Sequence, residues 1–141
     1  MSANAEPAIV STSPLADAQG RIIAYLRLSL TDRCNFRCEY CSVSDYEDPA
    51  AILSRGEIER LVGIFGRLGV RRVRLTGGEP TLRRDVVEIA AGVRATTGIE
   101  EVALTTNGHR LAELAGPLPR KWPFWNGCSE CRRPRSERTQ R

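Results

Sequence analysis

The sequence lacks any long apolar run, and it contains one histidine and a single lysine, Lys121. A helix that spans a bilayer needs about 18 or more consecutive apolar residues, and no stretch approaches that length. The first residues, MSANAEPAIVSTSP, lack the basic region and apolar segment of a secretory signal. These absences argue against the membrane-spanning and secreted classes, so the cytoplasm is the expected location, with no membrane partner.

A net positive charge is also missing from most of the chain. The 141 residues suffice for one domain with a modest core, and the formal net charge is +4. Residues 120–141 carry seven basic and two acidic side chains, whereas residues 1–119 carry fourteen arginines and fifteen acids. Because the net positive charge is confined to the tail, a nucleic-acid partner is not expected for the body of the chain.

Five cysteines in a chain without a secretory signal are better explained as metal or redox ligands than as disulfides. Three of them, Cys34, Cys38 and Cys41, lie within TDRCNFRCEYC. A structural zinc site needs four ligands, and no histidine lies between Arg21 and Gly108. An iron–sulfur cluster held by three cysteines would instead leave one iron open to a small molecule.

A zinc site remains the alternative interpretation. It would combine Cys38 and Cys41 with Cys128 and Cys131, whose CSEC spacing is that of a zinc pair, and would leave Cys34 idle. The same tail holds two tryptophans among its arginines, which suits stacking on bases and contact with phosphates. The non-enzymatic alternative is therefore a zinc-stabilised basic binding module.

Strand and helix signals alternate along the chain. Residues 1–20 show no apolar period and are expected to form a flexible leader. Apolar alternation predicts three strands and 3.6-residue periodicity predicts three helices, in the order strand 21–30, helix 53–69, strand 71–76, helix 80–98, strand 101–106 and helix 110–116. Crossover helices between short strands favour parallel pairing, so the predicted fold class is α/β.

Two local details accompany the predicted helices. Ser54 and Glu57 are spaced for a capping box at the start of the first helix, and Gly69 is placed to end it. Arg83 and Arg84 are expected to point into solvent from the first turn of the second helix.

Each predicted strand runs into an unusual loop: the first into the cysteines, the second into TGGEP and the third into TTNG. Sites in α/β folds form at the carboxyl ends of parallel strands, so these loops are expected to share a site. Side-chain parity puts the leucines of the first strand toward the helices, and Arg27, Arg74 and Thr105 on the opposite face. That face either lines a cavity for an anion or lies open to water, and parity alone leaves both possibilities open.

The spacing Cys34-xxx-Cys38-xx-Cys41, with Tyr40 before the last cysteine, resembles the motif of radical S-adenosylmethionine (SAM) enzymes. GGEP, residues 77–80, resembles that family's motif for the methionine end of SAM. The resemblance implies a [4Fe–4S] cluster whose fourth iron binds SAM, and an external one-electron reductant. It also implies a partial (βα) barrel, of which this chain would hold the first three βα units.

The segments GRIIAYLRLSLTDRCNFRCEYC, RVRLTGGEPTLRRD and ALTTNGHRL together resemble the GTP 3′,8-cyclases of molybdenum cofactor biosynthesis. The resemblance implies that GTP is converted to (8S)-3′,8-cyclo-7,8-dihydroguanosine 5′-triphosphate, and that the full-length family forms homodimers. It also implies roles for matching residues: Cys34, Cys38 and Cys41 as cluster ligands, Tyr40, Gly77, Gly78 and Glu79 as SAM contacts, and Arg27, Arg74 and Thr105 as GTP contacts.

The resemblance covers residues 21–118, which are therefore expected to be the N-terminal part of a radical SAM domain. Residues 119–141 form a divergent basic tail, interpreted as out-of-frame translation or a recombined end. The second three-cysteine cluster of that family is not found in this sequence. We therefore expect a truncated chain with doubtful activity of its own, and another radical SAM reaction on the same scaffold is the alternative activity.

Overall fold

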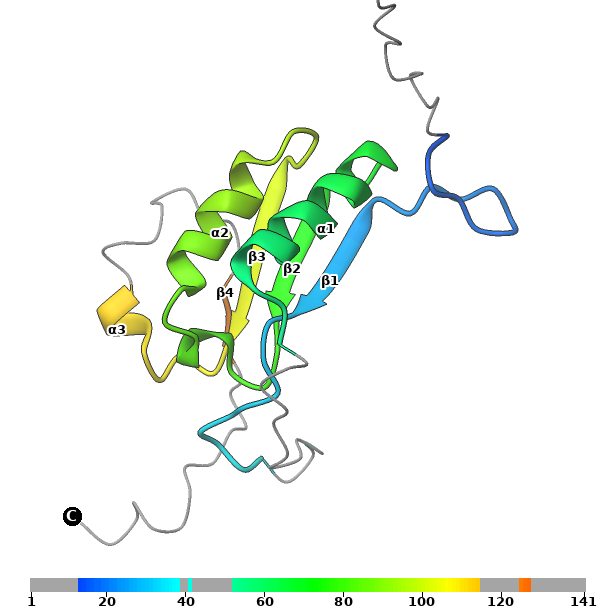
Figure 1. Cartoon of the computed structure of the whole chain (residues 1–141). Coiled ribbons are helices and arrows are strands. Elements are labelled where there is room, and N and C mark those ends of the chain that lie inside the picture. Colours follow the sequence, from blue (N-terminus) through cyan, green and yellow to red (C-terminus); the bar gives the residue numbers. More distant parts are fainter. Residues whose placement is uncertain (1–12, 39–40, 42–51, 115–124, 128–141) are drawn as a thin grey trace, which may run out of the picture.

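The computed structural model of the chain describes residues 13–38, 41, 52–114 and 125–127. Strands and helices alternate in the order β1, α1, β2, η2, α2, β3, α3, β4. Figure 1 shows one sheet, with α1 and α2 lying across one of its faces. This arrangement agrees with the predicted α/β class.

The sheet is parallel throughout, in the order β1–β2–β3–β4. Its strands span Tyr25–Ser29 (β1), Arg72–Thr76 (β2), Glu101–Thr106 (β3) and Trp125–Gly127 (β4). The first three lie within or match the predicted strands. The expectation of only three strands is wrong, because the backbone of β4 pairs with β3. A strand of three residues is too short to show the apolar alternation on which the prediction relied.

Helix α1, Arg55–Arg67, begins and ends where its sequence predicts. The Ser54 hydroxyl accepts a hydrogen bond from the Glu57 backbone N–H, and the Glu57 carboxylate accepts one from the Ser54 N–H at 2.7 Å. Gly69, just beyond the helix, has φ of 96°, a conformation that favours glycine. The predicted capping box and stop are therefore confirmed.

The second predicted helix is divided, and the expectation of one helix from Pro80 is wrong. A 3₁₀ turn, η2 (Pro80–Leu82), comes first, and the α-helix α2 spans only Val86–Ala95. Between them, Arg83 has extended backbone angles of φ −70° and ψ 131°. Its guanidinium binds groups outside the helix, as described below, and an extended residue cannot continue the helical hydrogen-bond ladder.

Helix α3, Leu111–Leu114, occupies the start of the third predicted helix, whose predicted end at residues 116–117 lies outside the described residues. In the described ranges, none of the helices has the length and apolar character that crossing a bilayer requires.

Before β1, Ala16 forms an antiparallel bridge with Ile22, and the Leu15 N–H donates to the Leu68 carbonyl at 2.7 Å.

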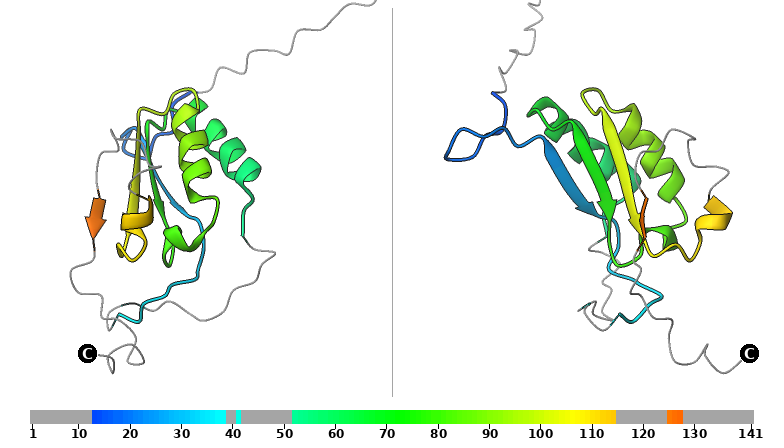
Figure 2. Two further views of the ribbon diagram at one scale, coloured as in Figure 1. Left: turned by 90° about the vertical axis from the view of Figure 1, so that its left-hand side faces the viewer. Right: turned by 180° about the vertical axis from the view of Figure 1, so that it is seen from behind.

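The core lies between the sheet and helices α1 and α2 (Figure 2). Its buried members come from alternate strand positions and from one side of each helix, and they include Leu28, Val73, Leu75, Val102, Leu104, Ile58, Val62, Ile89, Ala90 and Val93. No described helix covers the other face of the sheet, as the left view of Figure 2 shows. The carboxyl ends of β1, β2 and β3 lie at one edge, so the loops that follow them begin there.

Candidate functional site

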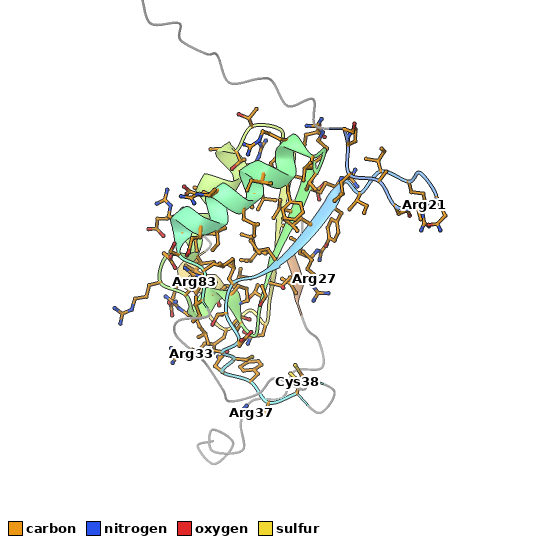
Figure 3. The ribbon with its side chains drawn as sticks, turned by 45° about the vertical axis from the view of Figure 1, so that its right-hand side comes forward. Arg21, Arg27, Arg33, Arg37, Cys38 and Arg83 are labelled. Atoms are coloured by element: carbon orange, nitrogen blue, oxygen red, sulfur yellow. The ribbon has the colours of Figure 1, made fainter. Side chains whose placement is uncertain are left out.

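The loop after β2 is hydrogen-bonded to the cysteine segment, which we define as residues 31–52. The Gly78 N–H donates to the Thr31 carbonyl, and the Glu79 N–H donates to the Arg33 carbonyl, both at 2.7 Å. Figure 3 shows Arg33, Arg37 and Cys38 beyond the end of β1, on the side where this loop lies. The first two loops predicted to share a site therefore touch through their backbones.

Two glycines make this contact possible. A Cβ atom on Gly77 would lie 2.5 Å from the Thr31 carbonyl oxygen, and one on Gly78 would overlap the carbonyl of Arg33. Any side chain at either position would push the cysteine segment away. The two glycines thus allow the loop after β2 to approach the backbone of residues 31–33. Their contact with SAM stays a prediction.

Glu79 joins the second loop to the third. It is 1% exposed, and its carboxylate accepts hydrogen bonds from the Thr106 hydroxyl at 2.7 Å and from the Asn107 N–H at 2.6 Å. The N–H and hydroxyl of Thr81 donate to the same carboxylate. A buried carboxylate is costly unless such donors surround it, so Glu79 fixes the relative position of these loops. The sequence analysis missed this role, and the contact of Glu79 with SAM stays a prediction.

Asn107 then links the third loop back to the first. Its side-chain amide donates to the Asn35 side-chain oxygen at 2.9 Å and lies 4.0 Å from the Cys34 sulfur. The adjacent His109 is exposed, and its ring packs edge-on against Phe36, with ring centroids 6.1 Å apart. All three loops that the sequence placed at one edge are therefore interlocked.

The three cysteines of the first loop are free thiols. Cys34 and Cys38 are half-buried, Cys41 is exposed, and the Cys41 N–H donates to the Cys38 carbonyl at 3.1 Å. Burial raises the pKa of the Cys34 thiol, and the nearby charge of Glu79 adds to this, while the N–H of Phe36 opposes it. Three unpaired thiols on one segment are a soft donor set that fits an iron–sulfur cluster.

Other predicted ligands cannot be placed. Within the described ranges, which include Cys34, Cys38 and Cys41, no group of three His, Cys, Asp or Glu side chains is arranged to hold a metal ion. The structure therefore does not gather the three predicted cluster ligands around one point, and their role stays a prediction. Tyr40, Cys128 and Cys131 lie outside the described residues. The zinc alternative that used the last two stays a prediction.

The three predicted GTP contacts share the uncovered face of the sheet. Arg27 and Arg74 are direct cross-strand neighbours in the β1–β2 register, and the Arg74 Nη1 atom donates to the Thr105 hydroxyl at 3.4 Å. Figure 3 shows Arg27 on the side of β1 away from the helices. No ion pair involving either arginine is found among the described residues.

This pairing is unfavourable without a ligand. Like charges directly opposite each other on a sheet repel. In addition, the Nε atom of Arg74 is buried and has no hydrogen-bond partner in the described part of the chain, which costs free energy. An anionic group between Arg27 and Arg74 would relieve both problems, so the arrangement suits phosphate or carboxylate.

Arg83 does not point into solvent, and that expectation is wrong. Its side chain is 12% exposed, and its Nη1 atom donates to the carbonyls of Leu30 at 3.1 Å and Leu53 at 2.8 Å. Its other nitrogens bind Asp85. Figure 3 shows Arg83 near the point where β1 runs into the cysteine segment. The neighbouring Arg84 is exposed, as expected.

Comparison with known proteins adds to this geometry. The family model described as "Radical SAM superfamily" matches residues 28–120. A GTP 3′,8-cyclase of Aeromonas hydrophila is 52% identical over 120 residues, which cover 80% of this chain and 34% of that protein. A GTP 3′,8-cyclase of Mannheimia succiniciproducens is 51% identical over 105 residues, or 72% of this chain and 31% of that protein. The molybdenum cofactor biosynthesis protein 1 of Drosophila melanogaster is 50% identical over 111 residues, or 77% and 20%. The chain thus spans about a third or less of the length of these relatives.

Proposed function

Because the chain belongs to the radical SAM superfamily, a family of enzymes, we propose that it carries the cluster-binding and SAM-binding part of a GTP 3′,8-cyclase. The observation that carries this proposal is the interlocking of three loops at the carboxyl edge of a parallel sheet. The loop with the cysteines bonds through Gly78 to the second loop, and Glu79 ties the second loop to Asn107 of the third. No helix of the described residues covers one face of the sheet that leads to these loops, and a substrate would bind on that face.

The cofactors in this proposal are a [4Fe–4S] cluster and SAM. Cys34, Cys38 and Cys41 would hold the cluster, which when bound and reduced supplies the electron for reductive cleavage of SAM. Residues 77–79, with Tyr40, would hold SAM beside it. The part of the chain's own residues is to fix the two loops against each other, since Gly77 and Gly78 admit no side chain at that contact.

The substrate in this proposal is GTP, which would bind on the uncovered face. Its triphosphate is an anion that would relieve the repulsion between Arg27 and Arg74 and accept hydrogen bonds from their guanidinium groups. Thr105 already accepts a hydrogen bond from Arg74, so it would orient that guanidinium toward the ligand. The relatives named for GTP 3′,8-cyclase activity support this substrate. The cytoplasmic location, the external reductant and the homodimer remain predictions.

Anaerobic reconstitution of the 141-residue chain with iron and sulfide tests the proposal. We expect about four irons per chain, and a reduced cluster whose electron paramagnetic resonance (EPR) spectrum changes when SAM is added. Cys38→Ala removes one ligand and should abolish the SAM-responsive spectrum. One zinc per chain without sulfide would favour the binding-module alternative, and a cluster that ignores SAM would contradict the proposal.

A further inference from the structure

One arginine outside the loops holds both ends of the cysteine segment. The Arg83 Nη1 atom donates to the carbonyl of Leu30, the residue just after β1, and to that of Leu53, just before the Ser54 cap of α1. Between these two carbonyls lie residues 31–52, which include all three predicted cluster ligands. A single guanidinium therefore closes the base of the segment.

The guanidinium is itself held in place. Arg83 Nε and Nη2 donate to the two carboxylate oxygens of Asp85 at 2.9 and 2.8 Å, a two-pronged contact that fixes the plane of the fork. The hydrogen bond from Arg83 also holds the pKa of the Asp85 carboxyl below its usual range, because the bond stabilises the ionised carboxylate. Asp85 precedes α2 but makes no side-chain cap bond there, because its carboxylate faces Arg83.

Four hydrogen bonds from one side chain need the geometry of arginine. A lysine ammonium at this position could reach one or two of these acceptors but could not match the planar fork. Bringing the ends of a long segment together costs conformational entropy, which the two carbonyl contacts offset in part. Arg84 is the natural control, because it is adjacent, carries the same charge and is exposed.

We propose that Arg83 is a positioning residue for the iron–sulfur cluster, because it fixes the two ends of the segment on which Cys34, Cys38 and Cys41 lie, so that fewer backbone arrangements have to be searched when the three thiols close on the cluster. This proposal rests on the proposed function, because it concerns the same cluster. Arg83 touches neither the cysteines nor the reacting groups in this role, and it acts only through Leu30 and Leu53.

The first test needs no cluster. Hydrogen–deuterium exchange would be measured on the complete metal-free chain, comparing the wild type with Arg83→Ala, Arg83→Lys and Arg84→Ala. We expect Arg83→Ala to speed exchange in peptides covering residues 29–38 by about tenfold or more, with peptides from α1 and β3 unchanged. Arg83→Lys should be intermediate, and Arg84→Ala should match the wild type. Unchanged exchange at residues 29–38, or an equal rise everywhere, would overturn the proposal.

The second test uses the same variants after anaerobic reconstitution. Arg83→Ala should lose iron to a chelator about tenfold faster than wild type and give a broadened EPR spectrum with SAM, whereas Arg84→Ala should not. Equal iron retention and spectra in wild type and Arg83→Ala would overturn the proposal. If the wild type takes up no cluster, the proposed function fails, and a local rise in exchange would still support Arg83 as the anchor of the segment.

Discussion

The two faces of the sheet are built from the same strands but carry different kinds of side chain. Toward α1 and α2, Leu28 and Leu75 are buried in a continuous apolar core. One residue along each strand, Arg27 and Arg74 lie beside each other on the opposite face, with Thr105 bonded to the second. Parallel sheets are usually apolar on both faces, and the polar face is the one to which the proposed function assigns GTP.

The two faces are expected to have different roles, one in the stability of the fold and the other in ligand binding. Substitutions on the helix-covered face should unfold the chain, whereas substitutions on the uncovered face should leave the fold intact and change only what binds there. Glu79 and the Arg83–Asp85 pair belong to neither face, because they lie at the carboxyl edge where the loops meet. Substitutions at Leu75, Glu79, Arg74 and Asp85 test this division and have successively smaller expected effects on folding or binding.

Leu75→Ala should have the largest effect on folding. Leu75 is a fully buried residue of β2, and a leucine-to-alanine change in such a core costs about 2–5 kcal/mol. Urea unfolding followed by circular dichroism measures the loss. Leu75→Met, which keeps the volume, should cost much less. Equal losses for the two variants would mean that the helix-covered face is not tightly packed.

Glu79→Ala should destabilise the loops by about 2–3 kcal/mol, because the buried donors of Thr106 and Asn107 lose their acceptor. Glu79→Gln keeps an oxygen and should cost about half as much. Urea unfolding gives the total loss, and hydrogen exchange shows where it falls. Confinement of the change to residues 31–38, 77–82 and 105–108 is the expected pattern. A change spread through α1 and α2 would contradict the assignment of Glu79 to the loops.

Arg74→Ala should weaken GTP binding by about tenfold or more while leaving unfolding by urea nearly unchanged. The stability is retained because the substitution also removes the repulsion from Arg27 and the unpartnered Nε atom. Arg60→Ala is the matched control, since Arg60 is an exposed arginine of helix α1, which covers the other face of the sheet. Calorimetric titration with GTP measures the affinities, and equal losses for both variants would remove Arg74 from the site.

Asp85→Asn should have the smallest effect, below about 1 kcal/mol, because the Asp85 carboxyl is partly exposed to solvent. The contact with Arg83 lowers the pKa of Asp85, so its stabilisation is present at neutral pH and is lost as the pH falls through that lowered pKa. Urea unfolding at several pH values should show wild type and variant differing near pH 7 and converging in acid. A difference that grows in acid would contradict this assignment.

The elements that sequence predicted well are those set by neighbouring residues. The Ser54–Glu57 capping box and strand Glu101–Thr106 are specified by short local patterns, and the structure has them where expected. Parity also placed Arg74 and Thr105 on one face although they are 31 residues apart, because the alternation of side chains carries over to every strand of a parallel sheet.

The elements that sequence missed depend on contacts between distant segments. Arg83 was assigned to solvent because its acceptors, Leu30 and Leu53, lie 53 and 30 residues earlier and leave no local signal. Glu79 was taken only as part of a ligand motif because its donors in the third loop lie 27 and 28 residues later. The division of the second helix was missed for the same reason as the contacts of Arg83. The helical pattern of the sequence does not reveal that Arg83 binds distant carbonyls and interrupts the helix.

The backbone contact between Gly78 and Thr31 has a consequence for how the protein is made. Translation runs from the N-terminus, so the cysteines are synthesised before the residues that brace their segment. The carbonyls of Thr31 and Arg33 can accept the backbone hydrogen bonds of Gly78 and Glu79 only when those residues have followed. We therefore expect a stable cluster to form only after the second loop has been synthesised.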